Sequence, residues 1–514
     1  MAEPDIASFS KELIDAVKEG RVKDRDSLQN LKLKLCKRYG LGEVPPNSDV
    51  LANVLPEDRK LLIPFLVKKP TRTISGVAVV AVMTSPHDCP HGRCAFCPGG
   101  VGNNSPQSYT GKEPAARRAG RNHFDPWMQV TDRITQLSEI GHKTDKIDLI
   151  VMGGTFTSRE PEYQEWFVRR CFDALNGKDS ETLEEAQRLN EVSEHRCVGL
   201  TVETRPDVFT PEQIDRVMRL GATRVELGVQ ILDDDVLRGV DRGHGISEVR
   251  ECTRNCRDRG LKVCYHMMPG LPGSSPDNDL KCFRRVFEDP DFRPDMLKFY
   301  PVLVVAGTKL YDMWEAGDYS PYLEEDAVPL LSKMKAMVPE YVRIQRIQRD
   351  IPVTEISAGI HKSNIRQLVG DYMQKNGMEC RCIRCREVGH RGTVLSDSDR
   401  VVLKDTVYEA SGGTEHFIAL EYDDSLIGYV RLRLDSNPVA TIRELKVFGK
   451  VASIGDEGED WQHRGYGRKL VSEAERIATE AGRKGIRVTS GVGVRGYYRS
   501  LGFTEGLPYK VKDL

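Results

Sequence analysis

Three cysteines stand close together in the segment CPHGRCAFCPGG, which begins at Cys89 and ends on two glycines. Cys89, Cys94 and Cys97 supply three thiols, a number that suits either a zinc ion or an iron–sulfur cluster. A four-iron cluster usually takes four cysteines, and three would leave one iron free to hold a small molecule. A zinc ion would instead add His87 or His91 as its fourth ligand. The segment predicts a metal centre, and its spacing alone leaves both kinds open.

A second trio of cysteines, Cys380, Cys382 and Cys385, follows much later in the chain. The C-x-C-x-x-C spacing with one more ligand suits a structural zinc ion. His361 and His390 are the candidates for that fourth ligand. The alternative is a set of thiols without metal. We expect a zinc site that holds a linker in place.

The composition is that of an ordinary folded chain in a reducing compartment. With 514 residues the chain is too long for one hydrophobic core, so two or three domains are expected. The apolar run from Val77 to Met83 is far shorter than the roughly 20 residues that cross a bilayer. The acidic N-terminus lacks the basic start and apolar block of a secretory signal. We therefore expect a cytoplasmic protein, without a membrane partner, whose cysteines remain thiols or bind metals.

Strand-like apolar runs alternate with helical segments through the middle of the chain. The runs are Val77 to Met83, Ile147 to Met152, Val198 to Val202, Arg224 to Val229, Lys262 to Met267 and Leu297 to Val302. This alternation predicts parallel strand–helix units, arranged as an open sheet or as a partial barrel. A polar motif follows each of the first five runs, and ligands bind at the carboxyl ends of parallel strands. A ligand site is therefore expected at that end of the sheet.

The spacing of the first trio, C-x-x-x-x-C-x-x-C, resembles the C-x-x-x-C-x-x-C triad of the radical S-adenosylmethionine enzymes. The resemblance implies a 4Fe-4S cluster on these cysteines, with S-adenosylmethionine on its free iron. Contacts to this cofactor are then expected from the strand-end motifs, where glycines let the backbone come close. The expected contacts are Gly153, Gly154, Thr155, Glu203, Arg205, Gln230 and His266. Lys298 is expected to be catalytic.

The C-terminal part, from about Thr406, contains short strands and then a glycine-rich turn that opens a helix. Backbone N–H groups at such a turn favour a pyrophosphate. The turn resembles the Q/R-x-x-G-x-G/A signature of the GNAT-type acetyltransferases, which implies bound acetyl-CoA. The implied contacts are Lys446, Gln462, His463, Arg464, Gly465, Tyr466, Gly467 and Arg468. Tyr497 and Tyr498 stand where that family keeps a phenol that can donate a proton or hold the thioester.

The two cofactor regions in this order resemble the catalytic subunit of Elongator. The likeness begins at about Thr73 and includes PHDCPHGRCAFCPGG, VMGGTF, RVELGVQ, HMMPGLPG, FRPDMLKFYPVLVVAGTKLY and SGVGVRGYYRSLGF. It implies an α/β chain: a radical SAM partial (β/α)6 TIM-like barrel followed by a GNAT-type α+β domain. The expected regions are a basic tRNA-binding region (1–72), a radical SAM domain (73–345), a linker with the zinc site (346–400) and an acetyl-CoA-binding domain (401–514).

This resemblance implies conversion of the wobble uridine of tRNA to 5-carboxymethyluridine. Carbon 5 of uracil and the methyl of an acetyl group are both unreactive toward ionic chemistry at neutral pH. We therefore expect a 5'-deoxyadenosyl radical to take a hydrogen from the acetyl methyl of acetyl-CoA, and the carbon radical to add to uracil. Reacting groups must be held in contact. The two cofactor domains are accordingly expected to face each other across one cleft.

Several partners follow from the same reading. The tRNA anticodon stem-loop would bind basic segments: Lys18 to Arg38, read as one amphipathic helix, Ala116 to Trp127, and Tyr341 to Asp350. An electron donor protein would reduce the cluster. The chain would act alone or as a homodimer, whereas eukaryotic relatives act in a multi-subunit complex.

Two rival functions remain open on the sequence alone. The first is a protein lysine acetyltransferase with a structural iron–sulfur cluster. The second is a tRNA-binding scaffold with vestigial cofactor sites.

Overall fold

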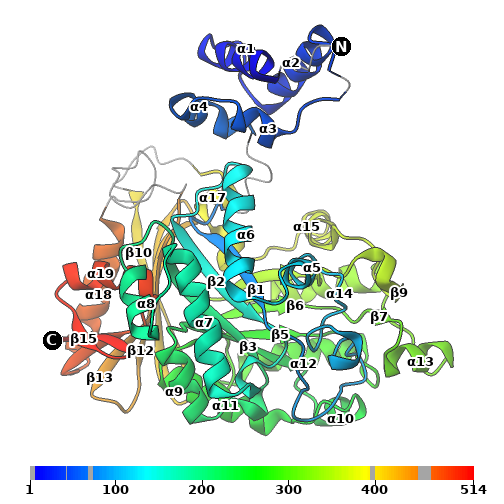
Figure 1. Ribbon diagram of the computed structural model, residues 1–514. Helices are drawn as coiled ribbons and strands as arrows, with labels where there is room; N and C mark the ends of the chain where they lie inside the picture. The colour runs from blue at the N-terminus through cyan, green and yellow to red at the C-terminus, as the bar shows by residue number, and fades with distance from the viewer. Residues whose placement is uncertain (1–5, 42, 67–72, 394–399, 450–464) are drawn as a thin grey trace.

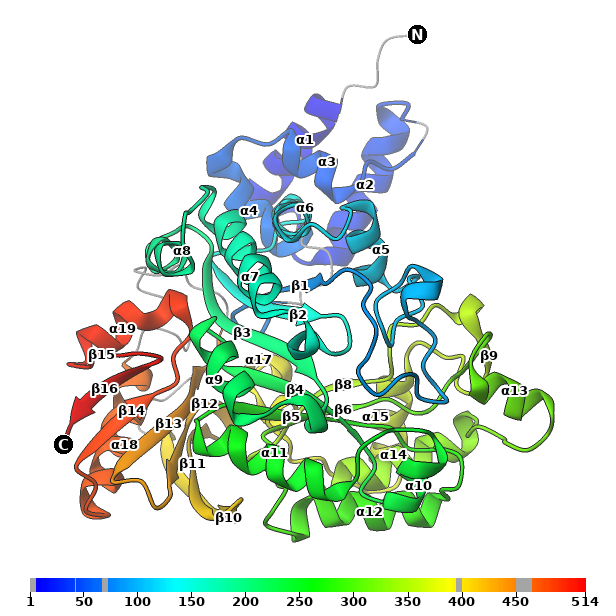
Figure 2. The same cartoon turned by 60° about the horizontal axis from the view of Figure 1, so that its bottom comes forward.

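The computed structural model describes residues 6–41, 43–66, 73–393, 400–449 and 465–514. Figure 1 shows a group of N-terminal helices, a central curled sheet among helices, and a C-terminal sheet at its side. Figure 2 shows the same three parts after rotation. Within the described ranges, no helix is both long and apolar enough to span a bilayer.

The N-terminal helices pack around a small core of their own. They are α1 (Ile6–Lys18), α2 (Arg25–Arg38), α3 (Asn47–Ala52) and α4 (Pro56–Leu66). The prediction of one helix from Lys18 to Arg38 is wrong. The chain turns at Gly20, with φ 71°, and Asp24 caps a new helix by accepting a hydrogen bond from the Ser27 backbone N–H.

The basic residues of α2 divide into two groups. Lys32 is only 3% exposed, and its Nζ donates to the Pro45 carbonyl and to Asn47 Oδ1, both at 2.7 Å. This lysine therefore joins two parts of the helical group and does not face a ligand. Lys34, Lys37 and Arg38 are exposed on the surface.

The central part is a half-barrel of parallel strands in the order β1-β2-β3-β4-β5-β6-β8. Its strands are β1 (Ala78–Met83), β2 (Lys146–Met152), β3 (Arg196–Thr204), β4 (Arg224–Gln230), β5 (Lys262–Met267), β6 (Met296–Phe299) and β8 (Arg343–Ile347). The six predicted strands are thereby confirmed as elements. The sequence prediction missed β8, because RIQRI carries two arginines and a glutamine beside only two apolar residues.

Helices cover the outer side of the half-barrel (Figure 1). Those that follow its strands are α5 (Pro114–Arg121), α6 (Pro126–Glu139), α7 (Pro161–Asn176), α8 (Leu183–Asn190), α9 (Pro211–Arg219), α10 (Asp234–Gly239), α11 (Ile246–Asp258), α12 (Pro276–Glu288), α13 (Lys309–Glu315) and α14 (Glu324–Ala336). Helix α9 shows the local cause: Thr210 caps its start in a capping box with Gln213. Gly221, with φ 99°, follows its end.

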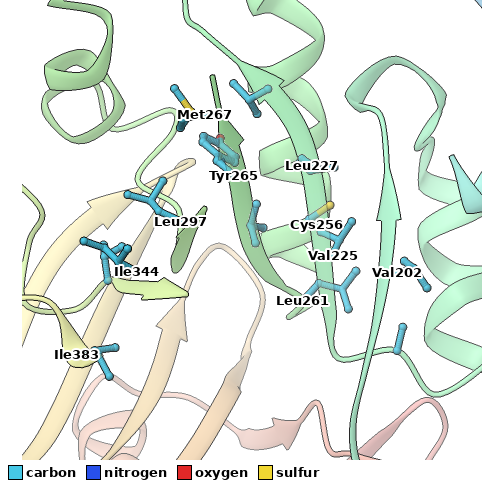
Figure 3. Close-up of a cluster of buried hydrophobic side chains, with 14 of the residues drawn as sticks. Val202, Val225, Leu227, Cys256, Leu261, Tyr265, Met267, Leu297, Ile344 and Ile383 are labelled. Carbon is cyan, nitrogen blue, oxygen red and sulfur yellow. The ribbon is translucent and has the colours of Figure 1, made fainter. Parts of the chain in front are cut away.

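The two faces of the half-barrel differ in chemistry. Alternate residues on the outer face are apolar and buried beneath the helices; Figure 3 shows Val202, Val225, Leu227, Tyr265 and Met267 in this core. The residues between them, on the inner face, are largely polar or charged, as in the run Arg224, Glu226, Gly228, Gln230 on β4. We call the space bounded by this inner face the lumen.

The segment expected to be a linker packs against the half-barrel. Strand β9 (Ile356–Ala358) pairs with β7 (Val304–Val305), and α15 (Ile365–Lys375), α16 (Ile383–Arg386) and α17 (Val388–Arg391) follow. Ile365, Val369 and Ile383 are buried in the same core as the barrel strands. This segment is therefore part of the folded body.

The C-terminal part is a sheet in the order β10-β11-β12-β13-β14-β16-β15. Its strands are β10 (Val402–Ala410), β11 (Gly413–Tyr422), β12 (Ser425–Leu434), β13 (Val439–Val447), β14 (Gly485–Val488), β15 (Thr504–Gly506) and β16 (Tyr509–Asp513); its helices are α18 (Tyr466–Glu480) and α19 (Arg495–Ser500). The parallel β13–β14 pairing stops at Ile442, although β13 continues to Val447. The two strands therefore separate beyond Ile442.

A buried network of charges joins this sheet to the half-barrel. Arg443 on β13 donates from Nη1 and Nη2 to the two carboxylate oxygens of Asp295, at 2.9 and 2.6 Å, and from Nε to Glu415, at 3.0 Å. Arg257 on α11 donates to Glu415 at 2.9 Å. Burial alone would raise the pKa of Asp295, but Arg443, Arg257 and Arg431 lower it. The carboxylates thus stay charged at neutral pH, and acidification removes their stabilising effect.

Two glycines allow the C-terminal part to approach the backbone of β3. A Cβ atom on Gly491 would lie 2.1 Å from the Val198 carbonyl oxygen, and one on Gly493 would lie 2.5 Å from Arg196 Cβ. These distances are far below van der Waals contact, so neither position has room for a side chain. The SGVGV motif is therefore a docking surface for the start of β3.

Replacing Arg443 by methionine tests the buried network. The change removes the arginine that donates hydrogen bonds to both Asp295 and Glu415, which costs about 3–5 kcal/mol for a broken buried pair. We expect the urea midpoint of the variant to fall well below that of the unchanged chain.

Arg476→Met on α18 is the matched control, because its ion pairs with Glu473 and Glu480 are on the surface. Its midpoint should be unchanged. An Arg443→Met midpoint equal to that of the control would contradict a stabilising role for the network.

Candidate functional site

The first cysteine trio lies buried in the loop after β1. His91 stands between two of the thiols: its Nδ1 is 3.0 Å from Cys89 Sγ and its Nε2 is 3.1 Å from Cys94 Sγ. Cys97 Sγ accepts a hydrogen bond from the Ser108 backbone N–H at 3.3 Å. Burial raises the pKa of the Cys97 thiol, and this hydrogen bond acts in the opposite direction, toward the thiolate form that binds metals.

Two arginines bring positive charge to the trio. Arg205 Nη1 donates to His91 Nε2 at 2.9 Å, and Arg242 Nη1 donates to Cys94 Sγ at 3.4 Å. Burial, together with Arg205 and Arg242, lowers the pKa of His91 to about 4, so its imidazole is neutral. The Nε atoms of both arginines are buried without a hydrogen-bond partner among the described residues. The surroundings therefore suit anionic ligands.

The spread of the thiols distinguishes the two kinds of metal centre. The sulfur atoms of Cys89, Cys94 and Cys97 do not all lie within 4.8 Å of one another. A tetrahedral zinc ion, with Zn–S bonds of about 2.3 Å, holds its sulfurs about 3.8 Å apart. A single zinc ion does not fit this spread, so a larger multi-iron cluster is the candidate that remains.

Gly153 and Gly154 follow β2 beside the trio, where the chain has no room for side chains. Gly153 has φ 139°, and a Cβ there would lie 2.0 Å from Thr84 Oγ1. Gly154 has φ 91°, and a Cβ there would lie 2.7 Å from the Gln107 carbonyl oxygen. Thr155 comes next, with its Oγ1 3.4 Å from Cys89 Sγ. The two glycines therefore allow close packing against Thr84 and Gln107 at this turn, and their contact with a cofactor stays a prediction.

These residues form one wall of a pocket at the carboxyl ends of the strands, which we call the thiol pocket. Its other lining residues include Tyr109, Glu203, Arg205, Gln230, Arg242, His266 and Arg349. Tyr109 donates to Glu203 at 2.7 Å. Gln230 has φ 71°, and its Oε1 has no partner among the described residues. Such a strained, unsatisfied polar group indicates a place for a ligand.

Lys298 lies below this pocket, in the lumen. Its Nζ donates to Glu226 Oε2, which also accepts from His266 Nε2 at 2.8 Å. Burial opposes the charge on Lys298, but the Glu226 carboxylate raises its pKa above the ordinary value. Glu226 and His266 line the pocket, whereas Lys298 does not. Lys298 is thus placed to act through Glu226 and not by touching a ligand.

A second pocket lies between the half-barrel and the C-terminal sheet, and we call it the interdomain pocket. The half-barrel contributes residues at or near the starts of its strands, including Lys146, Asp148, Gly199, Arg224 and Lys262. The C-terminal part contributes Lys446, Gly465, Tyr466, Gly467, Arg468 and Tyr497. Burial lowers the pKa of Lys446 to about 8, and nearby Arg343 acts in the same direction. The predicted residues Gln462, His463 and Arg464 lie outside the described residues.

The two tyrosines of α19 have different positions. Tyr497 is 39% exposed and lines the interdomain pocket. Its hydroxyl lies close to Gly467, where an added Cβ would come within 2.7 Å of that oxygen. Tyr498 is 5% exposed and packs edge-to-face against Phe503 in the core. The structure brings only Tyr497 to the pocket wall.

The two pockets do not share one cleft, contrary to the sequence prediction. The thiol pocket lies at the carboxyl ends of the strands, and the interdomain pocket lies at their amino ends. On β4, for example, Arg224 lines the interdomain pocket and Gln230 lines the thiol pocket. The strand-end rule that predicts the first pocket cannot locate the second, because docking of the C-terminal sheet creates it.

A basic groove adjoins the thiol pocket. It is lined by α5 and by the chain that follows β8, which are two of the predicted basic segments. Its charged residues are Lys112, Arg117, Arg118, Arg121, Arg346, Arg349 and Asp350. Arg346 and Arg349 line both the groove and the thiol pocket. The two segments, more than two hundred residues apart in sequence, therefore form one positively charged surface.

Sequence reasoning missed several residues of the thiol pocket. Tyr109, Arg242 and Arg349 stand within or beside motifs that point to this site, QSYTGK, DRGHG and RIQRD. Whether each of these side chains lines the pocket depends on the conformation of its loop, and the periodicity of the strands does not predict that conformation. Glu226 carried a signal, since a charged residue inside an otherwise apolar strand needs a partner.

The second cysteine trio is compact. The sulfurs of Cys380, Cys382 and Cys385 all lie within 4.8 Å of one another, a separation suited to one tetrahedral ion. Neither predicted histidine belongs to this group: the His361 backbone N–H donates to Glu324, and His390 is half-buried with its Nε2 unpartnered among the described residues. The trio itself supplies three of the four ligands that zinc needs.

Comparison with known proteins gives consistent matches along the chain. Residues 83–284 match the Radical SAM superfamily, 294–375 the Radical_SAM C-terminal domain, 6–74 the ELP3 N-terminal domain and 390–503 the Acetyltransferase (GNAT) family. A tRNA uridine(34) acetyltransferase of Methanocaldococcus jannaschii is 50% identical over 98% of this chain and 96% of its own. Elongator complex protein 3 of Homo sapiens is 42% identical over 99% of this chain and 96% of its own.

A solved structure supports the same relationship. The archaeal Methanocaldococcus infernus Elp3 with an N-terminal deletion (1–46) has a TM-score of 0.77 and 47% identity. The match covers 86% of this chain and 100% of that chain. The half-barrel and the C-terminal sheet therefore have a known counterpart.

Proposed function

Because this chain belongs to the family of tRNA uridine(34) acetyltransferases and Elongator complex protein 3, we propose that it converts the wobble uridine of tRNA to 5-carboxymethyluridine. It is a radical SAM acyltransferase by family. One observation carries the proposal: three buried thiols face a polar pocket in the same half-barrel whose other end forms a pocket with an acetyltransferase domain.

The thiol pocket would hold the iron–sulfur cluster and S-adenosylmethionine. When bound, they supply a carbon radical that takes hydrogen from an unactivated methyl group, which acetyl-CoA would provide. Cys89, Cys94 and Cys97 would hold the cluster. Gly154 lines this pocket and would present its backbone to the amino-acid end of the cofactor. The remaining polar contacts would come from Thr155, Glu203, Arg205, Gln230 and His266, with Gly153 shaping the turn.

The interdomain pocket would hold acetyl-CoA. Gly465 to Gly467 open helix α18, whose first N–H groups favour a pyrophosphate. Lys446, with its pKa of about 8, carries positive charge at neutral pH and would add to this attraction. Burial raises the pKa of Tyr497, so its hydroxyl remains protonated and can donate to the thioester carbonyl. Tyr498 supports that ring from the core, with ring centroids 5.4 Å apart.

The carboxylate of the product requires hydrolysis of the thioester. Water adds to the carbonyl carbon, the carbon–sulfur bond breaks, and coenzyme A leaves as a thiol. Tyr497 would serve the thioester while it lies in the interdomain pocket, because its hydroxyl faces the glycine turn that opens α18. Lys298 would act as a positioning residue, since it reaches the thiol pocket only through Glu226.

The basic groove would bind the anticodon stem-loop beside the thiol pocket. Arg117 and Lys112 are exposed on its rim, while Arg346 and Arg349 extend from the groove into the pocket. Phosphates in the groove would bring the wobble base, turned out of its stack, to the pocket mouth. The N-terminal residues Lys34, Lys37 and Arg38 would add contacts, whereas Lys32 would not.

A structural metal ion and a protein partner also belong to the proposed function. The compact trio Cys380, Cys382 and Cys385 would hold a structural zinc ion. A cytoplasmic electron donor protein would supply the electron that the cluster needs. The described residues suggest no particular oligomeric state.

Anaerobic protein with its cluster, reductant, S-adenosylmethionine, acetyl-CoA and tRNA provides the direct test. We expect mass spectrometry of digested tRNA to show 5-carboxymethyluridine, and product to disappear when either cofactor is omitted. Cys97→Ala should abolish product, whereas Cys282→Ala, at a buried cysteine outside both trios, should not.

Two results would overturn this function. Acetyl-lysine in protein substrates with unmodified tRNA would support a lysine acetyltransferase. Tight tRNA binding without any turnover would support a scaffold.

Neutralising the groove tests RNA binding. The double variant Lys112→Gln with Arg117→Gln should weaken tRNA affinity and lower the slope of log affinity against log salt by about 0.7–0.9 per lost phosphate contact. The control, Lys178→Gln with Lys375→Gln, removes the same charge outside the groove and should leave the slope unchanged. Equal slopes for the two double variants would rule out the groove.

Metal analysis tests the zinc site. We expect the unchanged chain to hold about one zinc ion in addition to its iron, and Cys382→Ser to lose the zinc with the iron retained. Retention of zinc in Cys382→Ser, or absence of zinc from the unchanged chain, would exclude the site.

A further inference from the structure

A line of partly exposed residues runs along the lumen face of β2, between the levels of the two pockets. On β2, Lys146, Asp148, Ile150 and Met152 are all partly exposed, while Ile147, Leu149 and Val151 between them are buried at 0%. The buried set faces the helices, so the exposed set faces the lumen. The four residues extend along the whole strand.

Ile150 is the important member of this line. Asp148 lines the interdomain pocket, and Met152 lines the thiol pocket, but Ile150 lies between them and lines neither. It nevertheless remains accessible, and so does Ala81, its partner in the register of β1. Val79, beside Asp148 on β1, is 41% exposed. Partly exposed side chains thus recur along β1 and β2 from the level of one pocket to the level of the other.

The inner face is also unlike the interior of a closed barrel. Layers of branched apolar side chains usually fill such an interior. Here the middle of the lumen carries Thr201, Glu226 and Cys264, and the Oγ1 of Thr201 and one carboxylate oxygen of Glu226 are buried without partners among the described residues. Arg224 Nε is unpartnered as well. Buried acceptors and donors without partners indicate that a polar group belongs in this space.

We infer that the lumen is a passage for the thioester-bearing arm of acetyl-CoA, which enters from the interdomain pocket and extends toward the thiol pocket. This inference rests on the proposed function, since that function requires the acetyl methyl to reach the radical. The pantetheine arm carries two amide groups. Thr201 and Glu226 offer acceptors to their N–H groups, and Arg224 offers a donor to a carbonyl oxygen.

The length of the passage agrees with an arm of this kind. Asp148 and Met152 are four residues apart on one strand, or about 13 Å at a rise of about 3.3 Å per residue. A nucleotide held at the glycine turn before α18 would therefore remain outside, while a thin flexible arm extends inward. The passage also explains how reacting groups from two separate pockets can meet, because the arm carries the acetyl carbon inward while the two domains stay in place.

A reporter thiol in the lumen tests this passage without any turnover. Bromoacetyl-CoA carries an electrophilic CH2–Br group in place of the acetyl methyl. A cysteine thiol that meets it forms a carbon–sulfur bond as the carbon–bromine bond breaks, and bromide and a proton leave. The variants Ile150→Cys and Ala81→Cys place such a thiol on two neighbouring strands of the lumen wall; Val192→Cys, at a site 76% exposed, is the control.

The full chain with its cluster in place is treated with the reagent, and peptide mass spectrometry measures alkylation at each introduced thiol. We expect the lumen thiols to react roughly tenfold or more faster than the control thiol, because the bound reagent holds its reacting carbon nearby. Excess acetyl-CoA should suppress labelling in the lumen and leave the control unchanged. Bromoacetamide has no CoA arm, so with this reagent the exposed control thiol should react faster than the lumen thiols.

The inference fails if both lumen variants bind acetyl-CoA but their thiols react no faster than the control, or if acetyl-CoA gives no protection. Using two variants keeps the test valid should one fail to fold. Failure here leaves the proposed function intact, because labelling needs neither S-adenosylmethionine nor tRNA. Conversely, fast labelling of the lumen thiols in a protein that forms no carboxymethyluridine would support the passage and contradict the proposed function.

Discussion

The buried ion network between the half-barrel and the C-terminal sheet is the constraint on which the rest of the structure depends. Asp295 and Glu415 are fully buried, and each is held by arginines, with Arg443 bonded to both. Charges without partners at these positions would be very costly, so the network permits one relative placement of the two parts. That placement creates the interdomain pocket, whose walls come from both.

The fixed placement sets the chemical problem that the half-barrel must solve. The thiol pocket and the interdomain pocket occupy opposite ends of the same strands, and radical chemistry requires contact between reacting groups. Closure of one domain onto the other would have to break the network and the close packing of Gly491 against β3. A polar lumen provides a simpler route, because only a flexible substrate arm has to move. The polar residues of the inner face then serve the reaction, although they pack less well than the apolar side chains that usually fill a barrel.

The sequence predicted those features that local patterns encode. The first trio and Gly153–Gly154 could be found because few other structures need thiols or glycines at that spacing, and six strands could be found because their apolar runs are continuous. Strand β8 was missed, since Arg346 faces the pocket and Arg343 pairs with Glu387, and both interrupt the apolar pattern. Lys32 looked like a ligand contact, but a buried lysine and an exposed one have the same appearance in a basic helix.

The relation between the pockets could not be predicted for a different reason. It depends on long-range pairs such as Arg443 with Asp295, which lie 148 residues apart, and on which end of the strands receives the second sheet. Strand periodicity predicts a sheet and its carboxyl-end site, but it is silent about what docks at the amino end. Tyr497 and Tyr498 likewise differ only through the docking of α19.

In the proposed reaction, one half-barrel joins a radical pocket to an acetyl-CoA pocket so that the acetyl group becomes part of the RNA. Acetyl-CoA labelled with carbon-13 at both acetyl carbons tests this origin, with the modified uridine analysed by mass spectrometry. Both labelled carbons should appear together in the carboxymethyl group. A carboxymethyluridine without the label, or with only one labelled carbon, would contradict it.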